Sequence, residues 1–128
     1  MRDQNYYQIM DAAASNGASR EALVLDYRHI VVAVSTAGFT GTLKFAGSIQ
    51  ETTPDFGAAQ SATNAFDYVQ AQKMEDNSDV AGDTGLALTT DTSVTLYEVN
   101  TNALRHFAVV ASSVSAGSVT VQLLGSSN

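Results

Sequence analysis

Residues 104–124, LRHFAVVASSVSAGSVTVQLL, constrain the fold more than any other part of the chain. Residues 118–123 alternate between polar and apolar side chains, which is typical of a β-strand with one buried face. Residues 107–111, FAVVA, are apolar at every position. A strand that is apolar on both faces needs a cover on each side. We therefore expect one face to meet the chain's own core and the other to meet a second sheet or another subunit.

Two segments that contain glycine predict tight turns. Residues 115–117, Ser-Ala-Gly, divide the C-terminal segment into two strands. Residues 37–41, AGFTG, lie between a β-branched run at 28–36 and an alternating run at 42–49. Glycine readily adopts the positive φ that hairpin turns require. The sequence therefore predicts two hairpins, one over residues 28–49 and one over residues 104–124.

Short strand patterns recur along the rest of the chain, and no long segment has helical periodicity. The patterns lie at residues 22–25, 66–72, 85–89 and 93–99, whereas residues 50–65 contain the only proline and predict a loop. Seven or eight strands at this spacing favour an all-β fold. We expect an antiparallel, jelly-roll-like β-sandwich over residues 22–128, preceded by an N-terminal arm over residues 1–21.

The charge of the chain argues against a nucleic-acid partner. The net charge is −7, and residues 74–104 contain six acidic residues but neither lysine nor arginine. An acidic surface repels phosphate groups. Only 15% of the residues are charged, below the usual quarter or so. Much of the surface is therefore small and neutral, which suits a subunit packed among neighbours.

The sequence also indicates where the protein is made. It has no cysteine, so its folding does not depend on an oxidising compartment. Its first residues lack the pattern of a secretory signal, and no apolar run approaches the length of a membrane span. We expect a protein made in the cytoplasm with no membrane partner.

No pattern of residues indicates catalysis or a resident metal. Residues 75–83 supply the oxygen ligands that calcium prefers, but they lack the spacing of an EF-hand loop. His29 and His106 have no third ligand at zinc spacing, and there is no Gly-x-Ser-x-Gly motif. We expect a solvated acidic loop, both histidines on an exposed or interface sheet face, no cofactor and no enzymatic activity. Calcium binding by the loop stays open.

Aromatic and aliphatic side chains provide the candidate contacts with a partner, since such residues are typical of protein interfaces. The candidate interface residues are Tyr6, Tyr7 and Ile9 in the arm, and Phe107, Val109 and Val110 in the strand that is apolar on both faces. The five tyrosines of the chain leave an alternative, in which aromatic rings stack on a glycan.

Four stretches between residues 40 and 123 resemble small all-β structural proteins of tailed bacteriophages. They are TGTLKFAGSIQETTPDF, AAQSATNAFDYVQ, GDTGLALTTDTSVTLYEVNTNALRH and SAGSVTVQL. The resemblance implies a virion component, and within that class it is strongest to capsid decoration, or cement, proteins. It further implies a homotrimer that binds the major capsid protein through loops and an extended arm. Two alternatives remain: a tail, baseplate or head-completion subunit, and a carbohydrate-binding module of a fibre.

Overall fold

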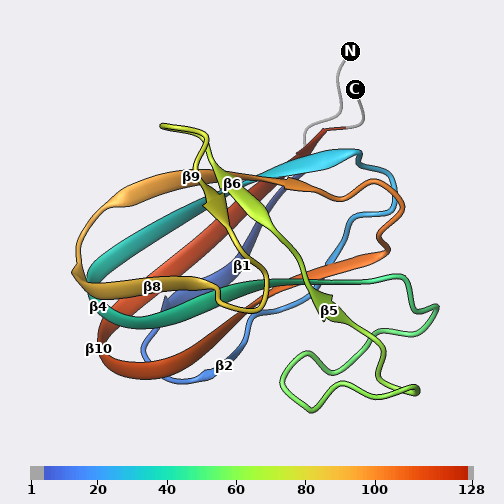
Figure 1. The fold of residues 1–128 in the computed structure, drawn as a ribbon, viewed down its shortest axis with the longest axis horizontal. Coiled ribbons are helices and arrows are strands. Elements are labelled where there is room, and N and C mark those ends of the chain that lie inside the picture. The colour runs from blue at the N-terminus through green and yellow to red at the C-terminus, as the bar shows by residue number, and fades with distance from the viewer. Residues whose placement is uncertain (1–4, 127–128) are drawn as a thin grey trace.

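The protein is described by a computed structural model that covers residues 5–126. These residues form ten strands and no helix, and all the strand pairs are antiparallel within one sheet (Figure 1). The all-β prediction is therefore confirmed. The strands are β1 (Asn5–Ala13), β2 (Gly17–Ala18), β3 (Ala22–Leu23), β4 (His29–Ser48), β5 (Asp67–Tyr68), β6 (Ala71–Lys73), β7 (Asp79–Val80), β8 (Leu86–Asp91), β9 (Val94–Asn100) and β10 (His106–Ser126).

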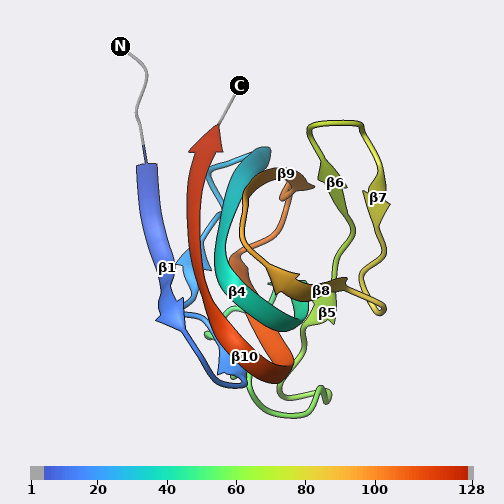
Figure 2. The ribbon, with the colours of Figure 1, turned by 90° about the vertical axis from the view of Figure 1, so that its left-hand side faces the viewer.

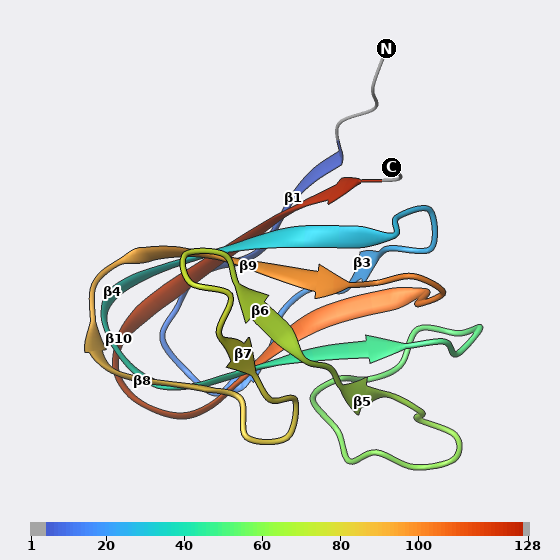
Figure 3. The same cartoon turned by 45° about the horizontal axis from the view of Figure 1, so that its top comes forward.

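Two long strands, β4 and β10, organise the whole sheet. They pair with each other along nearly their full lengths, from His29 opposite Ser126 to Ser48 opposite His106. Figure 3 shows both strands running to one end of the molecule, curving round and returning. Each strand therefore contributes one half to each of two layers. The sandwich consists of a single sheet that folds back on itself.

The two layers have different neighbours. In the first layer, residues 29–36 of β4 and 118–126 of β10 are flanked by β9, β6 and β7 on one side and by β1 on the other (Figure 2). In the second layer, residues 39–48 of β4 and 106–112 of β10 are flanked by β5 and β8 on one side and by β2 and β3 on the other.

Glycines in both long strands permit the bend between the layers. Gly38 in β4 has a φ of 60° and Gly117 in β10 has a φ of 70°, a region that favours glycine. A Cβ on Gly117 would lie 2.2 Å from the carbonyl oxygen of Gly38. The register of the pair also shifts between Ser112 and Ser118, as expected where bulges bend a strand.

The two predicted hairpins are wrong. Residues 37–41 and 115–117 are not turns, and the segments on either side of each belong to one continuous strand. The physical reason is that a positive φ serves a bend as well as a turn. Pairing between residues 58 to 97 positions apart replaces the local pairing that the sequence favours.

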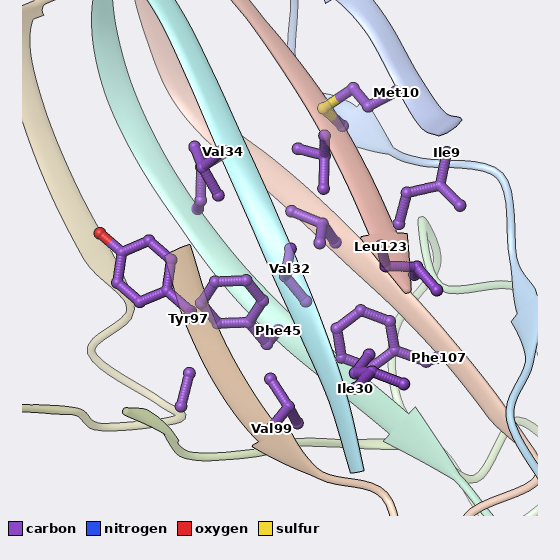
Figure 4. Close-up of a cluster of buried hydrophobic side chains, with 14 of the residues drawn as sticks. Ile9, Met10, Ile30, Val32, Val34, Phe45, Tyr97, Val99, Phe107 and Leu123 are labelled. Carbon is purple, nitrogen blue, oxygen red and sulfur yellow. The ribbon is translucent and has the colours of Figure 1, made fainter. Parts of the chain in front are cut away.

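One hydrophobic cluster fills the space between the layers. Ile30, Val32 and Val34 project from the first layer, and Phe45 and Phe107 project from the second (Figure 4). The rings of Phe45 and Tyr97, which come from opposite layers, have centroids 5.7 Å apart. Burial of these side chains is the main force that holds the folded sheet closed.

The described part of the predicted N-terminal arm lies inside this fold. Residues 5–13 form β1, which pairs with the second half of β10. A bulge between Gln8 and Met10 turns both Ile9 and Met10 into the core, where they are 4% and 7% exposed. Strands β1 and β2 of this segment are therefore part of the sheet, and the separate arm predicted for residues 1–21 is not seen in its described part. Residues 1–4 lie outside the described part.

The outer face of the second layer is covered by residues 49–66, which we call the covering loop. Phe56 and Phe66 of this loop pack on Ala46 and Ala108, and their ring centroids are 5.1 Å apart. Val110 lies against the same cluster and is half-buried. The second cover that the doubly apolar strand needs is thus supplied by a loop of the same chain, and not by a second sheet or another subunit.

A buried histidine anchors the covering loop. His106 is 3% exposed; its Nδ1 contacts the Glu21 carboxylate and its Nε2 lies 3.0 Å from the Gln50 carbonyl oxygen. The ring is therefore held at both of its nitrogens by oxygen atoms from two other segments. The Gln50 side chain in turn accepts from the Ala65 amide at the far end of the loop. The prediction of an exposed or interface position for His106 is therefore wrong.

The glycine pair at the bend makes a direct prediction. We expect Gly117→Ala to lower the free energy of unfolding by more than about 2 kcal/mol, because a Cβ there has both a strained φ and a backbone clash. Gly57→Ala is the matched control, since a Cβ at Gly57 meets only the Asp55 side chain, at 3.4 Å. Urea denaturation followed by circular dichroism measures both. Equal midpoints for Gly117→Ala and wild type would contradict the bend.

Candidate interaction surface

The outer face of the first layer has no covering segment over β1, β10, β4 and β9 in the described part of the chain. We call it the exposed sheet face. Its side chains alternate along each strand with those of the core, and the strand register places them in rows across β1, β10, β4 and β9. The residues of this face are Tyr6, Gln8, Val31, Ala33, Ser35, Val94, Leu96, Glu98, Thr120, Gln122 and Leu124.

This face combines exposed apolar side chains with neutral polar ones and carries little charge. Val94 is 71% exposed, Tyr6 is 61% exposed, and Leu96 and Leu124 are each 44% exposed. Glu98 is the single charged residue of the set defined above. Met74, also exposed, donates its amide to the Leu96 carbonyl and extends the apolar surface beyond β9. Contiguous apolar surface of this kind marks contact sites in soluble proteins.

A cleft opens beside this face, between the β6–β7 segment and strands β8 and β9. Its volume is about 1070 Å³, and its lining includes Lys73, Asp91, Leu88 and Tyr97. The Tyr97 ring belongs to the core, and its hydroxyl points away from the other labelled core side chains (Figure 4). The lining also includes Glu75 and Asp79, so the cleft combines one phenol, three carboxylates and one ammonium group.

Hydrogen bonds and burial shift two pKa values at this cleft. Hydroxyl donors from Ser93, at 2.7 Å, and Thr36, at 2.5 Å, hold the pKa of Asp91 below its ordinary value of 3.8. Burial raises the pKa of Tyr97 above 10.0, and the negative charges of Asp91 and Asp76 add to the shift. Asp91 is therefore ionised and Tyr97 neutral at physiological pH. The hydroxyl network also ties the turn after β8 to the bend in β4.

Three of the predicted interface residues are core residues. Ile9, Phe107 and Val109 are 4%, 0% and 0% exposed and all belong to the central cluster. A side chain with so little exposed surface cannot contact a partner protein, so the interface prediction is wrong for these three residues. Val110 lies under the covering loop and is half-buried. Their apolar character reflects the chain's own packing.

The other two predicted interface residues stay accessible. Tyr6 is 61% exposed and lies on the exposed sheet face, whereas Tyr7 is 36% exposed on the opposite side of β1. Tyr97 is buried, and Tyr68 packs edge-on against Phe66 beneath the Lys44 ammonium. The tyrosines thus lie in separate environments and do not form one stacking surface for a glycan.

The acidic loop shows no cluster of metal ligands. Within residues 5–126, no group of three or more His, Cys, Asp or Glu side chains could hold a metal ion. Asp76 accepts the Ser78 amide at 3.0 Å, and hydrogen bonds from Ser78 lower the pKa of Asp76. His29 lies at the start of β4, partly exposed, beside a polar pocket with Arg28 and Glu98. The described residues also include no helix that could span a membrane.

Val94 and Leu96 are the residues of the exposed sheet face that sequence reasoning missed. The segment SVTLYEV reads as an ordinary strand, yet both of its faces are apolar: Val94 and Leu96 on one, Tyr97 and Val99 on the other. The core covers Tyr97 and Val99 and leaves the first pair open. The same doubly apolar pattern that drew attention to residues 107–111 could have identified this surface.

The chain matches no protein-family model and no curated protein. Among solved structures, it is similar to the crystal structure of the SPBc2 prophage-derived protein YomS. The TM-score is 0.70 and the sequences are 17% identical, with 98% of this chain and 94% of that chain covered. A likeness at this identity shows that the two chains share a fold over almost their full lengths.

The Asp91 network predicts a specific dependence of stability on pH. The pKa of Asp91 is lowered in the folded state. The ionised Asp91 carboxylate therefore stabilises the fold above about pH 4, and this stabilisation is lost as the pH falls through the folded-state pKa. We expect Asp91→Asn to lower the free energy of unfolding by about 1 kcal/mol at pH 7. Between pH 6 and pH 3, the free energy of unfolding of this variant should fall less than that of wild type.

Asp83→Asn is the control for this prediction, because Asp83 is an exposed carboxylate outside the network. Urea denaturation at several pH values between 3 and 7 gives the free energies of unfolding. The role assigned to Asp91 is contradicted if Asp91→Asn and Asp83→Asn lose stability in parallel with wild type as the pH falls.

Proposed function

We propose that this chain is a structural subunit of a tailed-phage particle. The observation that carries the proposal is the fold shared with a prophage-derived protein over nearly the whole of both chains. The sequence resemblance to small phage structural proteins, which rests on different evidence, supports the same class. The exposed sheet face supplies a surface suited to contact with other proteins, and the proposal assigns the chain no enzymatic activity and no cofactor.

Within the particle, the proposed role is that of a capsid decoration protein. The chain would bind the major capsid protein on the assembled shell, as a homotrimer, and would be located in the virion. A protein that binds only the mature shell stabilises it by mass action. Several weak contacts from one oligomer raise the effective affinity without any single strong contact. The net charge of −7 supports a protein partner over nucleic acid.

Immunogold labelling of purified particles tests this role. Particles from the phage that encodes the chain are labelled with gold-tagged antibody against it, and antibody pre-absorbed with the pure protein is the control. We expect gold spread over the heads, because decoration sites repeat across the capsid. Gold confined to the tail or its tip would replace the decoration role with a tail or baseplate role. Absence of specific label would contradict the proposal of a particle subunit.

A further inference from the structure

We propose that the exposed sheet face packs on the same face of a second copy of this chain, about a twofold axis parallel to the strands. In that arrangement β1 of one copy lies over β9 of the other, and β10 lies over β4. The inference concerns contacts between copies and goes beyond the proposed function. It does not depend on where the protein is located on a particle.

The first support is that a loop of the chain covers one outer face of the folded sheet, whereas the other outer face stays exposed. The chain covers the second layer with Phe56 and Phe66 of its own covering loop. The first layer has no such cover, although Val94 and Leu96 project from it and are largely exposed. Two sheets that stack face to face at about 10 Å bury such side chains as well as a loop does.

The second support is charge, which restricts where two copies of this chain can meet. Two copies with a net charge of −7 each repel one another over most of their surfaces. Over β1, β10, β4 and β9 the exposed sheet face carries only Glu98 as a charged residue, and Asp79 of β7 continues the same row beyond Gln72. In the twofold arrangement Glu98 of one copy lies over Tyr6 of the other, since both occupy the same row at opposite edges of the face. The phenol hydroxyl of Tyr6 is a donor for that carboxylate.

The third support is the match of side chains within the rows. In the row that begins at Tyr6, Leu124 of one copy lies over Val31 of the other. In the next row, Gln122 lies over the small Ala33, and Gln8 lies over Leu96. Leu124 and Val31 thus form an apolar contact near the centre, and the long Gln122 side chain meets a small one. Stacked sheets are rotated by about 30° relative to each other, so the facing side chains of the two copies are best aligned near the centre of the face.

The size of the face predicts a weak contact. Four strands about 4.8 Å apart, over the seven residues of β9 at about 3.3 Å each, span roughly 440 Å² per copy. Two copies would bury roughly 900 Å², which lies in the range of weak and transient interfaces. We therefore expect dissociation constants from micromolar to millimolar and a monomer in dilute solution.

Sedimentation velocity over a range of concentrations tests the pairing. We expect the wild-type mass to rise from one chain toward two as the concentration approaches about 1 mM, and we expect Leu96→Lys to stay at one chain. Thr63→Lys, which adds the same charge on the exposed covering loop, should behave like wild type. A monomer at every concentration, or a mass that Leu96→Lys does not change, would overturn the proposal.

Because the chain has no native cysteine, cysteines introduced by mutation allow a second test that detects the contact between copies directly. One chain carrying Tyr6→Cys is mixed with a differently tagged chain carrying Glu98→Cys, and a bismaleimide is added whose length matches the spacing of about 10 Å between stacked sheets, which is too large for a direct disulfide. Each chain carries a single cysteine, so every cross-link joins two chains. We expect the mixed cross-linked product to form faster than in a control mixture of Tyr6→Cys with Thr63→Cys. Equal rates would contradict the arrangement.

These results are distinguishable from those on the proposed function. A twofold pair can form whether or not the chain is located on a capsid, and capsid labelling can succeed while the chain stays monomeric. The pairing concerns the free protein in solution, whereas the proposed homotrimer concerns the protein bound to a capsid. An assembly of three chains in free solution that Leu96→Lys does not change would overturn the pairing. Binding of the exposed sheet face to a different protein, with a monomeric wild type, would overturn it as well.

Discussion

The close approach of the Gly38 and Gly117 backbones sets the geometry on which the rest of the structure depends. These residues lie in adjacent strands, both have positive φ, and no Cβ fits between them at Gly117. The register shifts of β10 lie at this bend, and those of β1 lie next to it, opposite residues 119–122. Together they let one long antiparallel pair fold over and bring both of its halves around a single core.

This folding gives the sheet two outer faces. A loop of the chain covers one of them, and the other is exposed to solvent. On the second layer, the His106 network holds the covering loop in place over Ala46 and Ala108. On the first layer, comparable apolar side chains stay open to solvent. Since burial of apolar surface drives both folding and association, the open face is the natural site of contact with another protein.

Sequence patterns identified most of the strands and the class of fold, because alternation and β-branched residues report local burial. They also marked Gly38 and Gly117 as special. They did not distinguish a bend from a hairpin turn, because both use positive φ and the choice depends on pairing between β4 and β10, which is remote in sequence. For the same reason, Phe107 and Val109 were assigned to an interface, since nothing local shows that this face of the strand packs in the core against the first layer.

The central claim is that one outer face of the folded sheet is closed by the chain itself and the other is left for a partner. Amide chemical shifts, measured by NMR as the protein concentration is raised, test it most directly. The account predicts shift changes at Val94, Leu96 and Leu124, with none at Ala108 or Val110 under the covering loop. Changes centred on the covering loop, with the exposed sheet face unaffected, would contradict it.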